Sequence, residues 1–266
     1  MNCNICGGTS TFYFSKCFFK PYHKLLGTVE YYRCKYCGFV FSKTHYSMKQ
    51  REWEMLNKYF HHAIESPKYK KSNHPPYYEQ AMLLNILAKN NIINLADAID
   101  WGGGVGTLAK ILLKYFNIKL PVYDKYIRSN DPEVEYIINA GSKKYSVVIN
   151  SAVFEHIRNR ADLDSINNCV KEDGNLVLHT VVCANIPKDP DWFYLLPVHC
   201  SFYTNKSMAI LMKQWGYISS LYCPSAKSWI LFKEMKQDYN KVAMRINQEL
   251  HTDYLFYKKG FMDYWK

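Results

Sequence analysis

A short apolar strand that ends in an acid and runs directly into a glycine-rich loop constrains this chain more than any other feature. The strand covers residues 96–101, with Asp100 near its end. Glycines follow at alternate positions, Gly102, Gly104 and Gly106. Glycine lets a backbone turn sharply and approach a ligand without a Cβ in the way, and residues 107–115 have the pattern of a helix that would follow the loop. The pattern indicates a site for a nucleotide-like cofactor.

From residue 96 onward, short apolar strands alternate with helical stretches. The expected strands cover residues 96–101, 119–123, 136–139, 145–150 and 175–182. This alternation predicts an α/β fold with a Rossmann-like, doubly wound parallel sheet. The second strand closes at Asp124, 22 residues past Gly102. A carboxylate there can accept hydrogen bonds from ribose hydroxyls, so Asp124 is a second candidate for cofactor binding.

The spacing Asp-x-Gly-x-Gly-x-Gly that begins at Asp100 resembles motif I of the class I S-adenosylmethionine methyltransferases. The dinucleotide fingerprint Gly-x-Gly-x-x-Gly/Ala can also be placed on Gly104, Gly106 and Ala109, so an NAD-dependent enzyme stays open as an alternative. With the fingerprint placed there, two extra glycines separate it from the strand, and Asp100 has no role in cofactor binding. A glycine-rich turn that binds nothing is the third interpretation.

Two later segments extend the resemblance. Residues 145–157 are similar to the methyltransferase motif at the end of the fourth strand and to the Glu-His pair that often follows it. The resemblance implies four site residues: Asn150 and Ser151 beside the cofactor, and Glu155 and His156 at the mouth of its site as candidates for catalysis. Helix capping or core hydrogen bonding is the alternative for the last two. Residues 163–180 resemble the helix, turn and fifth strand of the same family.

Two Cys-x-x-Cys pairs, 27 residues apart, mark the N-terminal part of the chain. A glycine follows each pair and allows the tight turn that a zinc ribbon needs, so four thiolates can surround one ion tetrahedrally. The expected zinc ligands are Cys3, Cys6, Cys34 and Cys37. Four protein ligands leave no open position, so the zinc would be structural. Two disulfides or unrelated surface cysteines are the alternatives.

Composition bears on partners and location. Lys and Arg outnumber Asp and Glu by 34 to 23, a formal charge of +11, which favours anionic partners such as nucleic acid, nucleotide sugars or phosphorylated precursors. No leader pattern opens the chain, and no run approaches the roughly 20 apolar residues of a membrane span. We therefore expect a cytoplasmic protein, in which paired cysteines bind metal rather than each other.

The length predicts one large domain and one small one. The expected division is a zinc-ribbon-like module over 1–45, a helical linker or lid over 46–95, a methyltransferase domain over 96–235 and a helical tail over 236–266. Within the linker, helical periodicity runs over residues 53–64 and again over 77–89, and Ser66 and Pro67 are expected to interrupt it. A local basic cluster at Lys68, Lys70 and Lys71 indicates a solvated face.

The cysteine module in front of the domain narrows the resemblance to methyltransferases of nucleotide-linked sugars and of other surface-polysaccharide or antibiotic precursors. In the sugar C-methyltransferases of that group, a Tyr-x-Glu-His stretch after the fifth strand supplies acid-base residues. Here only His199 matches, because Leu196 and Val198 occupy the tyrosine and glutamate positions. C-methylation needs an enolate, whereas O-methylation needs one base. The departure favours an oxygen acceptor with His199 as general base, against a hydrogen-bonded loop histidine.

Other expectations concern the acceptor side. In ubiquinone-type O-methyltransferases a Glu-x-x-Glu-His pattern can hold a divalent ion, but Ala152 replaces the first carboxylate here, so no catalytic metal is expected. Residues 191–194, an aspartate followed by three aromatic residues, would form an acceptor lid or a hydrophobic loop anchor. An RNA methyltransferase is the competing enzyme, because some of those also carry a zinc ribbon and the charge suits a polyanion. A non-catalytic zinc- and cofactor-binding protein is the remaining alternative.

Overall fold

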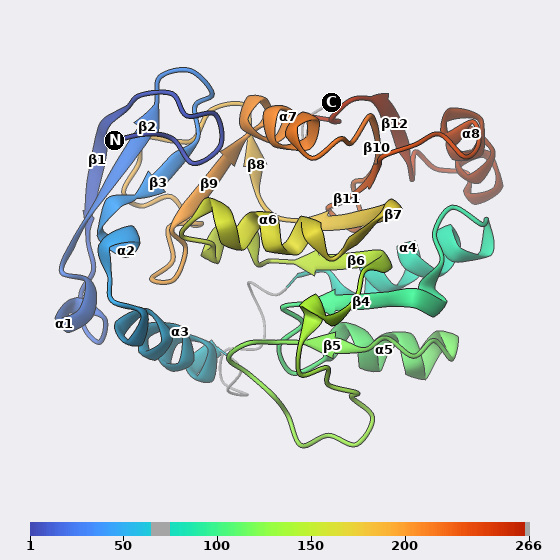
Figure 1. The fold of residues 1–266 in the computed structure, drawn as a ribbon, viewed down its shortest axis with the longest axis horizontal. Helices are drawn as coiled ribbons and strands as arrows, with labels where there is room; N and C mark the ends of the chain where they lie inside the picture. The colour runs from blue at the N-terminus through green and yellow to red at the C-terminus, as the bar shows by residue number, and fades with distance from the viewer. Residues whose placement is uncertain (65–74, 264–266) are drawn as a thin grey trace.

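Two β-sheets lie side by side in the computed structural model, which describes residues 1–64 and 75–263 (Figure 1). The larger sheet holds the glycine loop, and the smaller one holds the N-terminal strands. The expected helix break at Ser66 and Pro67 and the basic cluster at Lys68, Lys70 and Lys71 fall outside the described residues. No helix in the described part of the chain has the length and apolar character to cross a bilayer.

The larger sheet has the strand order β12-β10-β11-β7-β6-β4-β5. Its parallel half consists of β4 (Ala98–Trp101), β5 (Val122–Tyr123), β6 (Tyr145–Ser151) and β7 (Val170–His179). Its antiparallel half consists of β10 (Ser219–Cys223), β11 (Ser228–Phe232) and β12 (Phe256–Lys259). The expected fold class is confirmed: this is a mixed α/β, Rossmann-like sheet.

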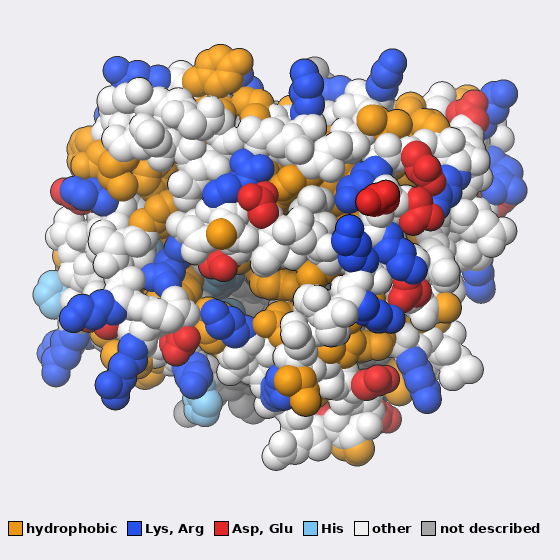
Figure 2. All heavy atoms as spheres, viewed as in Figure 1, with side chains coloured by type: hydrophobic (Ala, Val, Ile, Leu, Met, Phe, Trp, Pro, Cys, Tyr) orange, Lys and Arg blue, Asp and Glu red, His pale blue; other side chains and the backbone are white. Residues whose placement is uncertain are grey.

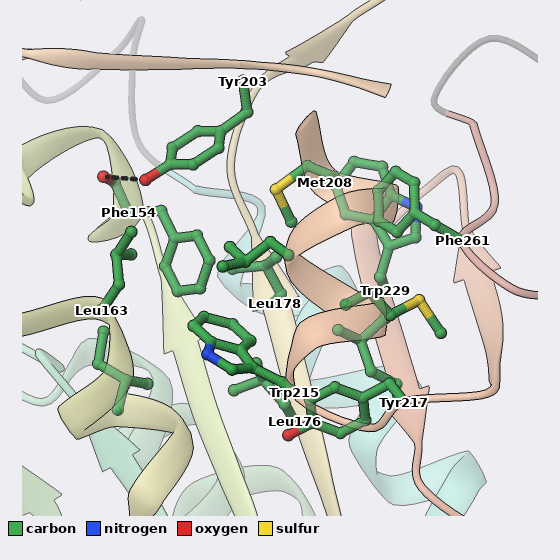
Figure 3. Packing of buried hydrophobic residues seen from close by; sticks show 14 of the residues in the cluster. Phe154, Leu163, Leu176, Leu178, Tyr203, Met208, Trp215, Tyr217, Trp229 and Phe261 are labelled. Carbon is green, nitrogen blue, oxygen red and sulfur yellow. Dashed lines mark hydrogen bonds between the residues drawn. The ribbon is translucent and has the colours of Figure 1, made fainter. Parts of the chain in front are cut away.

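Helices cover both faces of the larger sheet because its central strands are apolar on both faces. In β6, Val147 and Ile149 pack with one helical layer and Val148 with the other, as the two-residue period of a strand requires. The first layer contains α4 (Tyr77–Lys89), α5 (Thr107–Phe116) and α8 (Tyr239–Leu250). The second contains α6 (Arg160–Asn168) and α7 (Asn205–Gln214). Figure 3 shows this second layer, where the rings of Phe154 and Trp215 meet edge to face.

The smaller sheet joins the N-terminal strands to a later part of the chain, residues 182–204. Its strands are β1 (Ser10–Cys17), β2 (Thr28–Cys34), β3 (Val40–Ser42), β9 (Ser201–Thr204) and β8 (Val182–Cys183), in that order. Three short helices belong to it: α1 (His23–Leu26), α2 (Lys43–Ser47) and α3 (Gln50–Ile64). The antiparallel pairing of β3 with β9 sets Phe41 opposite Ser201. The N-terminal segment is thus paired directly with the chain that follows β7.

Several expected elements differ from those observed. Residues 136–139 contribute only one isolated bridge, Tyr136 to Val122, instead of the expected strand. The strand expected over 175–182 starts earlier, at Val170, and ends at His179; Val182 already belongs to the other sheet. The expected helical tail is α8 followed by β12, which pairs with β10 at the edge of the sheet.

Candidate active site

A cavity of about 910 Å³ opens between the two sheets at the carboxyl ends of the parallel strands. The last residue of each of these strands lines it: Trp101, Tyr123, Ser151 and His179. Helix α3 and the aromatic segment 192–194 form the opposite wall. Figure 2 shows the molecule hollowed between these two parts. Ligands of open α/β sheets bind at this end of the strands, so this cavity is the candidate active site.

The glycine loop forms one wall of the cavity. Gly102 and Gly104 both adopt positive φ angles, +79° and +55°, which side chains rarely tolerate. A Cβ on Gly102 would lie 2.5 Å from the Val153 side chain, whereas a Cβ on Gly104 would meet no atom within 4 Å. The first glycine therefore allows close packing of the loop against the residues that follow β6. The second leaves its backbone open to a ligand in the cavity.

Asp124 ties this loop to the end of β5. One carboxylate oxygen accepts the Gly104 N–H at 2.9 Å, and the other accepts the N–H groups of Tyr126 and Ile127, both at 2.8 Å. Three of the roughly four acceptor positions of a carboxylate are thereby occupied. Asp124 lines the cavity and retains about one position for a ligand hydroxyl. Its observed contacts are those of a loop anchor.

Asp100 lies beneath the loop, outside the lining of the cavity. It is 2% exposed, and its Oδ1 has no hydrogen-bond partner among the described residues. Burial, together with the nearby charge of Asp124, raises the pKa of Asp100 to about 7. This carboxyl contacts the loop backbone at Gly103. From this position, Asp100 can support the backbone of the glycine loop.

Of the remaining expected cofactor residues, one lines the cavity and two lie behind its lining. Ser151 lines the cavity, and its hydroxyl donates to Gln80 at 3.1 Å. Asn150 is fully buried behind it and donates to the Trp101 carbonyl at 3.1 Å. Gly106 begins α5 and packs against Val134, away from the lining. Four of the seven expected residues line the cavity, namely Gly102, Gly104, Asp124 and Ser151.

On the opposite side of the cavity, the three expected catalytic residues come together. Side-chain ligand atoms of Glu155, His156 and His199 all lie within 4.8 Å of one another, and the two imidazole centroids are 4.9 Å apart. All three residues line the cavity. The short helical turn Phe154–His156 supplies two of them, and the residues just before β9 supply the third.

Hydrogen bonds fix the chemical state of this group. Nδ1 of His199 lies 2.8 Å from the carbonyl oxygen of Tyr194, which can only accept, so Nδ1 carries the proton; Nε2 is then an acceptor, with no hydrogen-bond partner among the described residues. Burial lowers the pKa of the His199 imidazole to about 3, and burial also lowers the pKa of His156. Both rings are therefore neutral near pH 7.

Glu155 is held by two hydroxyl groups. Tyr194 donates to one carboxylate oxygen at 2.6 Å and Thr180 donates to the other at 3.0 Å. Burial raises the pKa of Glu155, which is 1% exposed. Tyr194 thus contacts both Glu155 and His199, the first through its hydroxyl and the second through its backbone. Sequence reasoning placed Tyr194 in a lid and assigned it no such contacts.

A third imidazole was also missed. The ring of His61, on α3, lies 5.4 Å from that of His156, centroid to centroid, and lines the same cavity. Helical periodicity placed His61 on a helix, but only the folded chain brings that helix against the end of β6.

The family of the chain follows from a comparison of its sequence with models of known families. The model described as a methyltransferase domain matches residues 77–218, more than half of the chain. The chain belongs to this methyltransferase family. The match contains the glycine loop, Asp124 and the group formed by Glu155, His156 and His199, but not the N-terminal cysteines. A comparison with curated proteins found no match.

Solved methyltransferase structures resemble the chain at low sequence identity. The plantazolicin methyltransferase BpumL with a pentazolic desmethylPZN analog and SAH has a TM-score of 0.43 and 11% identity, covering 69% of this chain and 98% of that chain. Magnesium protoporphyrin IX methyltransferase from Synechocystis PCC 6803 with SAH has a TM-score of 0.44 and 14% identity, covering 69% and 98%. The Burkholderia thailandensis 1,6-didemethyltoxoflavin-N1-methyltransferase has a TM-score of 0.44 and 12% identity, covering 70% and 89%.

The methyltransferase also gathers its four N-terminal cysteines at one point. The Sγ atoms of Cys3 and Cys37 are 3.6 Å apart, those of Cys6 and Cys34 are 3.5 Å apart, and all four lie within 4.8 Å of one another. A disulfide requires about 2.05 Å. Four sulfurs around a zinc ion at 2.3 Å are ~3.8 Å apart in a tetrahedron. The spacing therefore fits a zinc ion and does not fit two disulfides.

Proposed function

We propose that this methyltransferase uses S-adenosylmethionine to methylate a hydroxyl oxygen of a nucleotide-linked sugar or of a capsule or surface-polysaccharide precursor. One observation carries the proposal: a single cavity joins an open glycine backbone at Gly104 to a neutral imidazole whose Nε2 is free, that of His199. A cofactor that carries a reactive methyl group and an acceptor that must lose a proton could meet between them.

The cofactor end would be formed by the loop and its anchor. Gly102 and Gly104 would bring the backbone against the cofactor, and the remaining acceptor position of Asp124 would take a ribose hydroxyl. Asp100 and Asn150 would act from behind, by holding the loop and the strand ends. S-Adenosylmethionine would supply a methyl group on a positively charged sulfur, which is already a good leaving group.

On the acceptor side, we assign the proton to Nε2 of His199. As the new carbon–oxygen bond forms and the carbon–sulfur bond breaks, the hydroxyl proton passes to that nitrogen, and one positive charge moves from sulfur to imidazole. The Glu155 carboxylate lies within 4.8 Å and would stabilise the charge on the imidazole. A buried imidazole with a low pKa is suited to this transfer only when bond formation makes the hydroxyl more acidic, so the two events would be coupled.

The cations that line the cavity support an anionic sugar. Lys125, Arg158 and Lys227 line the cavity, and Arg158 is held in place by the backbone carbonyls of His45 and Met48 rather than by a carboxylate. Lys and Arg side chains are also spread over the face around the hollow (Figure 2). Such cations favour phosphate groups, and a phosphoryl or phosphoramidate oxygen is a variant of the same acceptor.

The aromatic segment 191–194 would close over the sugar. Trp192 and Phe193 line the cavity, and Phe193 is 69% exposed. An exposed ring at the rim of a cavity can pack on the apolar face of a pyranose. We further propose a structural zinc ion at the four N-terminal cysteines, a cytoplasmic location, and the division of the chain at residues 45, 95 and 235.

The first test is calorimetric titration of the purified chain with S-adenosylmethionine, S-adenosylhomocysteine and NAD in parallel. We expect micromolar binding of the first two and none of NAD. Labelled methyl transfer would then be measured with nucleotide sugars and with RNA as acceptors. Binding of NAD alone, or transfer to RNA with a steep dependence on salt, would overturn the proposal.

A further inference from the structure

Three metal-binding side chains meet on the acceptor side of the cavity, although no local sequence pattern joins them. Glu155 and His156 are adjacent, and His199 lies 43 residues later in the chain. Glu155 and His199 are 1% and 6% exposed, so the group is shielded from bulk water except through the cavity. One carboxylate and two imidazoles form a donor set that zinc and first-row transition metals prefer.

The hydrogen bonds around the group leave its donor atoms free. The Tyr194 carbonyl holds Nδ1 of His199, which fixes the tautomer and leaves the Nε2 lone pair available, the usual arrangement of a metal-binding histidine. Nδ1 of His156 is buried and has no hydrogen-bond partner among the described residues. A buried polar atom without a partner calls for an explanation, and a bound ion would supply one.

Glu155 is oriented in the same manner. The hydroxyls of Tyr194 and Thr180 each donate to one of its oxygens, which occupies about two of the roughly four acceptor positions. The remaining positions can reach a cation. Hydroxyl donors that fix a carboxylate without neutralising it are typical of the outer layer of a metal site.

We propose that Glu155, His156 and His199 bind a divalent transition-metal ion at the acceptor end of the cavity. Ligand atoms bound to one ion at ~2.1 Å lie roughly 3–4 Å apart, so a small contraction of the present spacing forms the site. Three protein ligands leave a coordination position open. Because all three residues line the cavity, that position faces the acceptor.

Binding of the ion is independent of the proposed function, but its use rests on that function. An acceptor hydroxyl bound to the open position would lose its proton to water more readily, because a cation lowers the pKa of a hydroxyl bound to it. The oxygen would then attack the methyl carbon as the carbon–sulfur bond breaks. With the ion present, Nε2 of His199 is a ligand, and the ion takes over the task that the imidazole has in the metal-free site.

The test uses Co²⁺ as the probe on the full chain, with zinc retained at the N-terminal cysteines after dialysis against a mild chelator. We expect one Co²⁺ per chain, with weak d–d absorption and without sulfur-to-cobalt charge transfer. The variants His156→Ala and Glu155→Gln should weaken Co²⁺ binding by roughly tenfold or more. The matched control is His179→Ala, because His179 lines the same cavity but lies outside the group.

Glu155→Gln retains the shape of the side chain, so it separates loss of a ligand from loss of folding, which circular dichroism would monitor. Absence of a nitrogen- or oxygen-bound Co²⁺, or binding that stays unchanged in both variants, overturns the inference. Methyl transfer is measured separately. Transfer by a chain that fails to bind added Co²⁺ would leave the proposed function intact and remove this site, whereas Co²⁺ binding without transfer to any acceptor would remove only the proposed function.

Discussion

The Tyr194 hydroxyl donates a hydrogen bond of 2.6 Å to the carboxylate of Glu155, a residue 39 positions earlier in the chain. The same tyrosine accepts the Nδ1 proton of His199 at its backbone carbonyl. One residue of the aromatic segment therefore positions a carboxylate and an imidazole on the acceptor side of the cavity. Its hydroxyl can be removed without removing its ring, which makes its role testable.

We expect Tyr194→Phe to reduce methyl transfer while leaving S-adenosylmethionine affinity unchanged. The buried Glu155 carboxylate would lose its shortest hydrogen bond, which costs about 1–3 kcal/mol of unfolding free energy. Denaturant melts and calorimetric titration measure the two effects. Tyr78→Phe is the control, because Tyr78 is 64% exposed and should show neither. Equal losses of cofactor affinity and transfer would argue against a role confined to the acceptor side.

Substitution of Asp124, which anchors the glycine loop, should affect the cofactor end of the cavity. In Asp124→Ala, the N–H groups of Gly104, Tyr126 and Ile127 lose their acceptor. We expect S-adenosylmethionine affinity to fall by roughly 10- to 100-fold, the equivalent of about 1–3 kcal/mol. Calorimetric titration provides the measurement. Glu133→Gln, on the exposed loop that follows, is the matched carboxylate control. Unchanged affinity in Asp124→Ala would remove this residue from the cofactor site.

Asp100 should make the stability of the chain depend on pH. Its pKa is about 7 in the folded chain and ~3.9 in an unfolded one, so folding favours the protonated form. Stability is therefore expected to fall as pH rises from about 4 through 7, as the buried carboxyl becomes charged. Asp100→Asn should flatten this part of the profile and stabilise the ligand-free chain at pH 8, by at most roughly 4 kcal/mol. Urea unfolding midpoints of the parent chain and of Asp100→Asn at pH 5 and pH 8 would test this. The same change of midpoint with pH in both proteins would show that another group is responsible.

Loss of one cysteine ligand should destabilise the smaller sheet. Cys37 is 2% exposed, and its carbonyl accepts the Thr204 hydroxyl at 2.5 Å, beside the pairing of β3 with β9. Cys37→Ser is expected to release one zinc ion per chain and to lower the unfolding free energy by several kcal/mol. Metal analysis and thermal melts would follow these changes. Cys17→Ser, at an exposed thiol, should retain the zinc and the stability of the parent chain.

Features that depend on short stretches of sequence could be predicted. The glycine loop and the helix after it follow from backbone sterics, and the periodicity over Tyr77–Lys89 matched α4 at both ends. What sequence reasoning could not supply were contacts between distant segments. The sequence reasoning considered only position 152 for a carboxylate that could join Glu155 in a metal site. In the folded chain, the side chain that lies near Glu155 and His156 is that of His199. The exchange of β8 and β9 into the N-terminal sheet was missed for the same reason, because a strand's partner is set by packing and not by its own residues.

The pairing of β3 with β9 also restricts how this protein can change its acceptor. His199 stands two residues before β9, and α3, which lies on the same wall of the cavity, follows the N-terminal module. The acceptor wall is therefore encoded at two places almost 150 positions apart, and the cofactor wall at a third. A chimera that exchanges only the N-terminal module together with α3, or only the segment after β7, would combine halves of two different walls. Acceptor specificity in such a chain would have to be transplanted as a matched pair of segments, while the glycine loop stays in place.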